Sequence, residues 1–269
     1  MIITFSGTGN SLLVARQLQK RLGGSIVLLE GDMLLHPEKQ LLEVAPGENV
    51  VWVFPVYSWG IPQVVEAFIR LVRFKGAHEA RHFLVVTCGD DIGYTDNCWR
   101  SLIGRRGWSP RGSFSVTMPN TYVCLKGFDV DAPDVAQRKL DDMPTRVESI
   151  AEAIARGFSG DDVVRGSWAW LKTYVVRPLF LLFLSSPKPF RCDAAKCSSC
   201  GLCASSCPME NITMHQGYPV WGSRCALCLR CYHICPTGAV EYGTATEGKG
   251  RKKVYINNTI NPEIQNERR

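Results

Sequence analysis

The feature that most restricts how this chain can fold is a cysteine pattern that occurs twice near its C-terminal end. In each copy the gaps between four cysteines are two, two and three residues, and proline follows the last cysteine at once. The copies are Cys197-Cys200-Cys203-Cys207-Pro208 and Cys225-Cys228-Cys231-Cys235-Pro236. An apolar residue also recurs five positions after each last cysteine, as Ile212 and Val240. This self-similarity indicates an internal duplication, in a segment too short to fold on an apolar core alone.

Iron–sulfur ligation explains this spacing better than zinc does. Zinc sites usually take two separated cysteine pairs around one ion, whereas three cysteines on one tight loop suit a cubane cluster. In two-cluster ferredoxins the fourth cysteine of each run binds the other cluster. We therefore expect two 4Fe-4S clusters. The expected ligands are Cys197, Cys200, Cys203 and Cys235 for one cluster, and Cys225, Cys228, Cys231 and Cys207 for the other.

Cysteine usage also bears on the cellular compartment. The chain has 12 cysteines in 269 residues, and its first apolar run begins at Ile2, where an export signal would otherwise stand. Metal or redox ligation in a reducing cytoplasm is therefore favoured over a disulfide framework. For Cys88 a packing role is favoured over a redox role, and for Cys192 an idle thiol over an alternative ligand. Roles stay open for the cysteines outside the repeat, which are Cys88, Cys98, Cys124 and Cys192.

The N-terminal part alternates between strand and helix patterns. Apolar runs predict strands at 2–5, 26–29, 50–54, 83–86 and 114–118. Helical spacing predicts helices at 12–22, 64–72, 96–103 and 134–155, with the segment after residue 29 the least regular. This alternation predicts an α/β fold with a doubly wound, five-stranded parallel sheet. Its ligand site should lie at the carboxyl ends of the strands.

The first strand runs into the sequence FSGTGNS, residues 5–11. It is not a Walker loop, because no lysine follows before Lys20, and Leu12 stands where a dinucleotide fingerprint needs its third glycine. Hydroxyl groups and backbone N–H groups at a helix start suit a phosphate anion. A capped strand-to-helix turn explains the loop alone equally well.

Together with the cysteine repeat, three N-terminal loops resemble a known family. Ser6–Ser11 resembles the flavodoxin phosphate loop, while 55–62 and 87–94 resemble the two flavin-ring loops of that fold. To about Gly243, including Met118-Pro119-Asn120, the chain resembles the bacterial and archaeal family of flavodoxin–ferredoxin fusion proteins.

The resemblance implies FMN as a cofactor. Tyr57 and Trp59 are the candidates for stacking on the flavin ring. The acids Asp90 and Asp91 differ from the family pattern, because negative side chains do not suit a loop that should bind an anion. We expect these acids either to cap the next helix or to repel negative charge near the flavin. The implied phosphate ligands are Ser6, Thr8, Gly9, Asn10 and Ser11, and the implied ring-loop residues are Pro55, Tyr57, Trp59, Gly60, Gly89, Asp90, Gly93 and Tyr94.

The chain therefore divides into four expected regions. These are a flavodoxin-like FMN-binding domain (1–160), a connector (161–190), a two-cluster ferredoxin domain (191–245) and a basic polar tail (246–269). The connector is rich in aromatic residues, too short to span a bilayer, and interrupted at Arg177-Pro178. Its simpler interpretation is packing against both domains. The alternative is an interfacial helix or docking surface for a membrane or partner.

The net charge of +6 arises entirely after residue 160, where 14 basic residues face 8 acidic ones; before it the count is 17 against 17. Two oxidised clusters and a flavin phosphate, at about −4 and −2, would nearly cancel this excess, which argues against nucleic acid. The basic run 249–253 is accordingly interpreted as a solvated tail rather than a docking patch.

The chemistry is expected to belong to the cofactors, since no catalytic constellation and no nicotinamide fingerprint is visible. The favoured function is an electron-transfer flavoprotein that relays electrons between clusters, FMN and a redox partner such as a ferredoxin or oxidoreductase. The alternatives are a flavin-dependent reductase of a small quinone or nitro compound, and a redox sensor or assembly factor.

Overall fold

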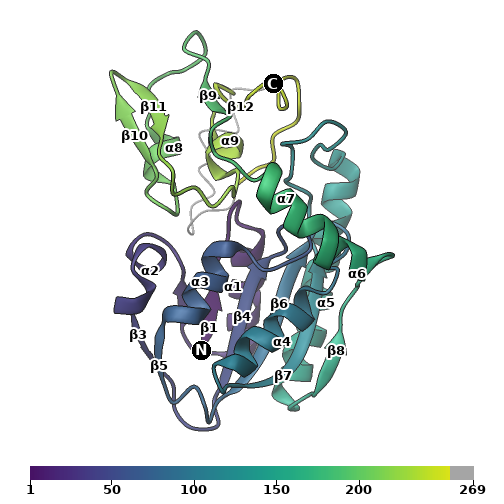
Figure 1. Cartoon of the computed structure of the whole chain (residues 1–269). Coiled ribbons are helices and arrows are strands. Elements are labelled where there is room, and N and C mark those ends of the chain that lie inside the picture. The colour runs from purple at the N-terminus through teal and green to yellow at the C-terminus, as the bar shows by residue number, and fades with distance from the viewer. Residues whose placement is uncertain (255–269) are drawn as a thin grey trace. The chain divides into compact units, whose positions relative to one another are not determined.

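The computed structural model describes residues 1–254, and these form two compact units. The first unit contains residues 1–6, 10–120 and 132–185, so most of the expected connector belongs to it. The second contains residues 7–9, 121–131 and 186–254. Figure 1 shows the elements of both units.

The first unit is built on a six-stranded sheet with the order β2-β1-β4-β6-β7-β8. Every neighbouring pair of strands is parallel. The first five strands in this order follow the 2-1-3-4-5 arrangement of flavodoxin-like doubly wound folds, which confirms the expected fold class. The strands are β1 (Ile2–Thr4), β2 (Ile26–Leu28), β4 (Asn49–Pro55), β6 (Arg81–Cys88), β7 (Ser109–Thr117) and β8 (Gly160–Asp162).

The sixth strand, β8, was not predicted. Its sequence, Gly-Asp-Asp, has no apolar residue, so no hydrophobic pattern marks it. It forms because its backbone pairs with the edge strand β7, where Gly112 faces Gly160. Edge pairing of this kind depends on neighbouring backbone and not on side-chain hydropathy.

Helices cover both faces of the sheet. Helices α1 (Asn10–Leu22) and α5 (Pro133–Ala155) pack against each other and bury apolar residues on one face, where Leu18 and Ile150 meet Val53 of the sheet. Helices α3 (Gln63–Leu71) and α4 (Thr95–Arg105) also contact each other and lie on the opposite face (Figure 1). Each helix follows a strand, so the loops at the carboxyl ends of β1, β4 and β6 come to one edge of the sheet.

The irregular segment after β2 contains only short elements. They are α2 (Asp32–Leu35), the 3-10 turn η1 (Pro37–Lys39), and β3 (Leu41–Glu43), which pairs in parallel with β5 (Arg73–Lys75). The sequence pattern of this segment is irregular. Gly31 and Pro37 interrupt it, which explains why its elements are short.

The expected connector contains a helical run over residues 169–183. It consists of α6 (Ala169–Leu171), a π-helical turn η2 (Lys172–Val176) and α7 (Arg177–Phe183). Pro178 has no backbone N–H to give to the preceding turn, which accounts for a widened turn directly before it. Among the described residues, no helix combines the length and apolarity that crossing a membrane would require.

The second unit repeats its own architecture. Short helices α8 (Leu202–Ser205) and α9 (Arg230–Ile234) occupy the same place in each cysteine run. Strand β9 (Phe190–Cys192) pairs with β12 (Val240–Tyr242), and β10 (Ile212–His215) forms a hairpin with β11 (Tyr218–Trp221). The expected apolar positions Ile212 and Val240 are both buried and both begin a strand.

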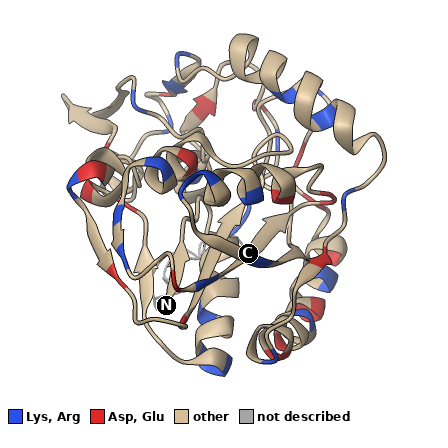
Figure 2. Cartoon of the chain, turned by 60° about the horizontal axis from the view of Figure 1, so that its bottom comes forward, with Lys and Arg blue, Asp and Glu red and all other residues tan. Residues whose placement is uncertain are grey.

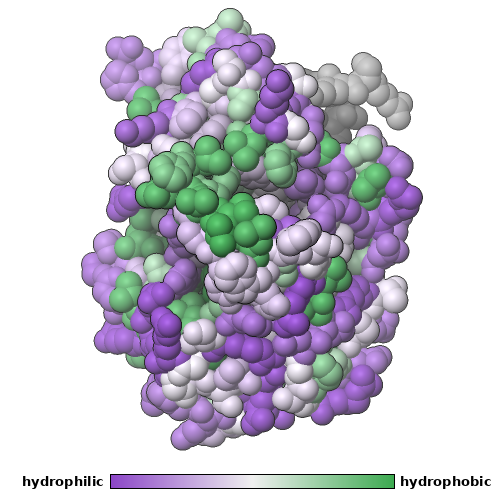
Figure 3. Space-filling model, turned by 45° about the vertical axis from the view of Figure 1, so that its right-hand side comes forward, coloured by the Kyte–Doolittle hydropathy of each residue, from purple (hydrophilic) through white to green (hydrophobic). Residues whose placement is uncertain are grey.

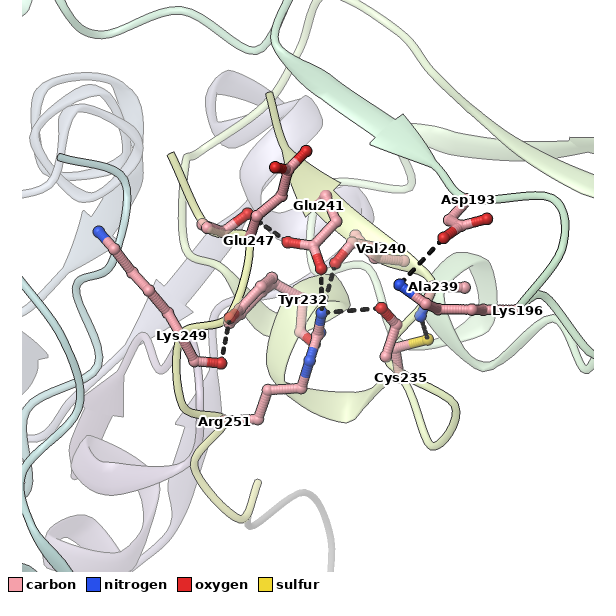
Figure 4. Close-up of polar contacts among 12 residues, drawn as sticks. Asp193, Lys196, Tyr232, Cys235, Ala239, Val240, Glu241, Glu247, Lys249 and Arg251 are labelled. Atoms are coloured by element: carbon pink, nitrogen blue, oxygen red, sulfur yellow. Dashed lines mark hydrogen bonds and ion pairs between the residues drawn. The ribbon is translucent and has the colours of Figure 1, made fainter. Parts of the chain in front are cut away.

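The basic run 249–253 differs from the expected solvated tail, because Lys249, Arg251 and Lys252 are partly buried and only Lys253 is exposed. Arg251 lies 3.8 Å from the ring centroid of Tyr232 and donates hydrogen bonds to the carbonyls of Gly238 and Val240 (Figure 4). The ammonium of Lys249 donates to the carbonyls of Val123 and Leu125, at 2.7 and 2.5 Å. The positive charges therefore satisfy carbonyl groups of the second unit, while residues 255–269 of the expected tail lie outside the described residues.

Candidate functional site

Four cysteines from the two runs line one cavity in the second unit. Cys225, Cys228 and Cys231 come from the second run, and Cys207 is the last cysteine of the first. The remaining wall is apolar and includes Ile212 and Trp221. The fold thus brings together the four thiols that the spacing assigned to one cluster. The meeting of Cys207 with the three cysteines of the second run is a property of the folded unit.

The backbone of the two cysteine loops has the same conformation in both copies. Ser199 and Leu227, the residues before the second cysteine of each run, have φ angles of 56° and 51°. Gly201 and Leu229, the residues after it, have φ angles of 71° and 59°. Left-handed residues in such loops turn successive N–H groups toward one point and form anion-binding concavities that are typical of iron–sulfur sites. Three of these four residues are not glycine, and they adopt a conformation that costs energy in the absence of compensation.

Backbone N–H groups also reach the fourth cysteine of each run in equivalent ways. The N–H of Asn211 donates to Sγ of Cys207 at 3.4 Å, and the N–H of Ala239 donates to Sγ of Cys235 at 3.2 Å. Donors of this kind favour the thiolate form that binds metal. Burial raises the pKa of the Cys235 thiol, but backbone donors and the Thr237 hydroxyl outweigh it and leave that pKa lowered.

The other expected ligand set lies together as well. Burial raises the pKa of Cys203 to about 11, and the nearby thiols of Cys235 and Cys200 contribute to the rise. Cys192, which the sequence left outside the repeat, forms a side-chain hydrogen bond with Cys197 and lies near Cys203. Among the described residues, no three Cys, His, Asp or Glu side chains converge closely enough for a single metal ion.

A buried arginine stands between two of the cavity's cysteines. Arg230 is 3% exposed, and its guanidinium donates to the carbonyl oxygens of Gly7 and Ser206, at 2.6 and 2.8 Å. Burial raises the pKa of Cys228, and the positive charge of Arg230 acts in the opposite direction. Arg230 therefore supplies positive charge where a cluster with thiolate ligands would be negative.

The loop between β1 and α1 has the features of an anion site. Gly9 has a φ of 99°, and α1 begins at Asn10 with no acidic residue in its first turn. Ser6 and Ser11 are buried, and Ser11 Oγ lies 2.7 Å from Thr87 Oγ1. The Nδ2 group of Asn10 donates to the Pro119 carbonyl, whereas its buried Oδ1 has no hydrogen-bond partner. A ligand hydroxyl would satisfy this acceptor.

The loop after β4 is a strained turn. The carbonyl of Tyr57 accepts a hydrogen bond from Gly60 N at 3.2 Å, and the two central residues, Ser58 and Trp59, have φ angles of 48° and 55°. Two positive φ angles define a type I′ turn, which non-glycine residues adopt only at a cost. The ring of Tyr57 meets Phe5, at the end of β1, edge to face at 6.2 Å. This turn therefore stands beside the β1–α1 loop, at the switch point of the strand order.

The loop after β6 is held by its own acid. Asp91 Oδ1 accepts a hydrogen bond from Gly93 N at 3.2 Å, and Asp91 Oδ2 forms an ion pair with Lys172 at 2.6 Å. Asp91 thus closes its own loop and pairs with a cation, but it does not cap α4, because the N-cap of that helix is Tyr94 and no side chain caps it. Asp90 is exposed at the start of the same loop. Lys139 donates to the carbonyl of Gly89 at 2.8 Å and fixes the other end of the loop to α5.

The helical run 169–183 joins the β4 and β6 loops to each other. Thr173, which is 3% exposed, donates its hydroxyl to the Trp59 carbonyl at 3.0 Å and accepts from Tyr94 N at 2.8 Å. The guanidinium of Arg177 donates to the Ile61 carbonyl at 2.6 Å. The fit is so close that a Cβ on Gly93 would stand 2.5 Å from Thr173 Oγ1.

Sequence reasoning missed these three polar residues of the helical run, which are Lys172, Thr173 and Arg177. They were assigned to a connector because the surrounding residues are apolar or aromatic. Their signal was present in the sequence, since the three are the only polar side chains between Trp170 and Leu184 besides Tyr174. Isolated polar residues in an apolar helix commonly mark the side that meets polar groups of the protein.

Three cysteines outside the repeat behave as packing residues. Burial raises the pKa of Cys88 to about 12 and that of Cys124 to about 12, so both thiols are protonated at neutral pH. Burial also raises the pKa of Cys98. A protonated, buried thiol is a poor nucleophile, which agrees with the packing role favoured for Cys88.

Comparisons with known proteins support the cluster site. Residues 196–241 match the family model described as "4Fe-4S dicluster domain", in agreement with the expected 4Fe-4S clusters. No curated protein matches the chain.

Solved structures resemble the chain only weakly. The Trp repressor binding protein from Bacillus subtilis aligns at 12% identity with a TM-score of 0.37, covering 57% of this chain and 96% of that one. An azoreductase from Bacillus anthracis str. Sterne aligns at 12% identity with a TM-score of 0.35, covering 56% and 98%. TM-scores this low do not establish a common fold, so the fold assignment rests on the strand order described above.

Proposed function

We propose that this chain is an electron-transfer flavoprotein of the flavodoxin–ferredoxin fusion type, which relays low-potential electrons between two 4Fe-4S clusters, FMN and a redox partner. The observation that carries the proposal is the cavity lined by Cys207 together with Cys225, Cys228 and Cys231. A thiol set drawn from both runs is what a two-cluster ferredoxin requires. When bound, the clusters would exchange single electrons and the flavin one or two.

The residues of the second unit would hold the clusters and tune them. One set comprises the four thiols of the cavity, and the other comprises Cys197, Cys200, Cys203 and Cys235. The N–H groups of Asn211 and Ala239 would stabilise negative charge on the sulfurs of Cys207 and Cys235. Hydrogen bonds to cluster sulfurs and exclusion of water are the main means by which a protein sets a cluster potential.

The residues of the first unit and the β1–α1 loop would hold FMN. The phosphate would lie at the start of α1, where N–H groups and the hydroxyls of Ser6, Thr8 and Ser11 are available. The unpaired Oδ1 of Asn10 would accept a hydrogen bond from a ribityl hydroxyl. The turn at Tyr57–Gly60 and the loop from Gly89 to Tyr94 would flank the ring.

The helical run favours a carrier over the alternative reductase. Arg177 and Thr173 of this run contact the loops after β4 and β6, and they leave no room for a Cβ at Gly60 or Gly93. Loops fixed in this way suit a redox centre that changes charge with little rearrangement. A reductase of small quinone or nitro compounds would instead need an open substrate pocket beside the ring.

Anaerobic purification with iron, sulfide and flavin analysis, followed by reductive titration, tests the proposal. We expect about eight irons and one FMN per chain, with reduction of both cofactor types by a low-potential donor. Fewer irons, or the absence of flavin, would contradict it. Rapid turnover of one quinone or nitro compound, with poor reduction of acceptor proteins, would favour the reductase instead.

A further inference from the structure

The helical run 169–183 carries its apolar side chains outward. Six exposed apolar positions are separated by three, one, four, three and one residues, which places them along one face of the helix, and Val176 and Leu184 are also exposed. Leu182 and Phe183 are each 72% exposed. We call this face the apolar stripe, and its residues are Leu171, Tyr174, Val175, Leu179, Leu182 and Phe183. Hydrophobic surface gathers over this run in Figure 3.

The polar side chains of the same helix point inward, so its polarity is the reverse of an ordinary surface helix. Lys172 pairs with Asp91, Thr173 joins Trp59 to Tyr94, and Arg177 binds the Ile61 carbonyl. Rotating the helix to bury the stripe would break all of these contacts. The outward orientation is therefore fixed by the first unit, and an apolar stripe of this size indicates an interaction site.

Aromatic and basic residues accompany the stripe. Trp168 and Trp170 stand at its N-terminal end and are 78% and 61% exposed. Between residues 163 and 192 the chain has five basic residues and no acidic one, and Figure 2 shows the helical run without acidic residues. Three of the five pair with acids elsewhere in the chain, as Arg165 with Asp96, Lys172 with Asp91 and Arg191 with Glu247. The run therefore presents apolar and aromatic side chains rather than free charge, and tryptophan prefers the boundary between water and lipid.

We propose that the apolar stripe docks the first unit on the surface of a phospholipid bilayer. A helix of residues 169–183 is roughly 22 Å long, too short to cross the hydrocarbon core. It would lie parallel to the surface, with Leu182 and Phe183 among the acyl chains and the two tryptophans at headgroup level. The proposal does not depend on the identity of the cofactors.

Vesicle flotation of the full chain, purified anaerobically with its cofactors, tests this docking. We expect binding to phosphatidylcholine vesicles, and comparable binding when they contain about 30% phosphatidylglycerol, because the contact is made by apolar and aromatic side chains. The double variant Leu182→Asn/Phe183→Asn should reduce the partition coefficient more than about tenfold, because it removes two exposed apolar groups. Circular dichroism and cofactor content would show that the variant is folded.

A matched control removes apolar groups from the other unit. Tyr218 and Val220 of β11 are 40% and 50% exposed, so Tyr218→Asn/Val220→Asn should leave vesicle binding unchanged. The proposal is overturned if the unaltered protein does not float with either kind of vesicle, or if both double variants bind as it does. It is also overturned if light scattering shows a dimer that only Leu182→Asn/Phe183→Asn dissociates, since the stripe would then be covered by a second copy.

Discussion

The hydroxyl of Thr173 donates a hydrogen bond to the carbonyl of Trp59 at 3.0 Å, and through it the helical run 169–183 is joined to the strained turn after β4. The same hydroxyl accepts a hydrogen bond from Tyr94 N, in the loop after β6. One buried side chain thus fixes the relative position of two loops that lie far apart in sequence. If these loops flank a flavin ring, the hydroxyl acts as a positioning group.

The variant Thr173→Val tests this role. Valine has nearly the same shape, but it leaves the Trp59 carbonyl and the Tyr94 N–H without a partner, at a cost of about 1–3 kcal/mol. We expect FMN affinity, measured by fluorescence titration, to fall at least about fivefold. Thr173→Ser keeps the hydroxyl and should bind FMN like the unaltered protein. Equal affinity in all three proteins would contradict the positioning role.

The phosphate assignment predicts a difference between two ligands. Thr8→Ala removes a buried hydroxyl from the β1–α1 loop. Because hydrogen bonds to charged groups contribute about 1.5–3 kcal/mol, FMN binding should weaken about 10- to 100-fold. Riboflavin, which has no phosphate, should bind the variant and the unaltered protein equally, as measured by calorimetry. If FMN and riboflavin lose affinity equally in Thr8→Ala, the hydroxyl does not act through the phosphate and the assignment is contradicted.

The ligand sets can be tested by combining substitutions. If Cys207 serves the cluster of the second run, Cys207→Ser/Cys225→Ser damages one cluster twice and should retain about four irons per chain. Cys197→Ser/Cys207→Ser removes one ligand from each set and should affect both clusters. Iron analysis and electron paramagnetic resonance of the reduced proteins measure the difference. The reverse pattern would show that each run binds its own cluster.

Acidification should destabilise the first unit through His82. Its Nδ1 accepts a hydrogen bond from Trp52 Nε1 at 3.1 Å, and burial lowers its pKa to about 4. The unfolded chain, with a histidine pKa near 6.5, binds more protons between about pH 6.5 and 4, so the free energy of unfolding falls as pH decreases through this window. The total loss approaches about 3 kcal/mol.

Denaturant unfolding at pH 7 and pH 5, followed by circular dichroism, measures this dependence. His82→Gln should be less stable at pH 7 but lose less stability between the two values than the unaltered protein. An unaltered slope in His82→Gln would assign the acid sensitivity to other groups.

The sequence predicted five strands and four long helices because the spacing of their apolar residues can be recognised without knowing the tertiary structure. It did not predict β8, whose three residues pair through the backbone alone. It also assigned the run 249–253 to solvent, because a cluster of basic residues does not indicate which carbonyl groups it will contact in the folded chain. In the structure Arg251 and Lys249 satisfy such carbonyls.

The sequence by itself determined the duplicated cysteine loops, since ligand spacing is a local property and both copies adopt the same left-handed turns. It also determined which three loops lie at the carboxyl ends of the strands. The ferredoxin spacing also predicted that Cys207 joins the cysteines of the second run, which line one cavity with it. Only the tertiary structure decided that Thr173 joins Trp59 to Tyr94. It likewise decided that the helical run turns its apolar stripe to solvent. The reason is physical: these relationships depend on which segments pack together, and periodicity along the chain records only that a face is apolar, not what covers it.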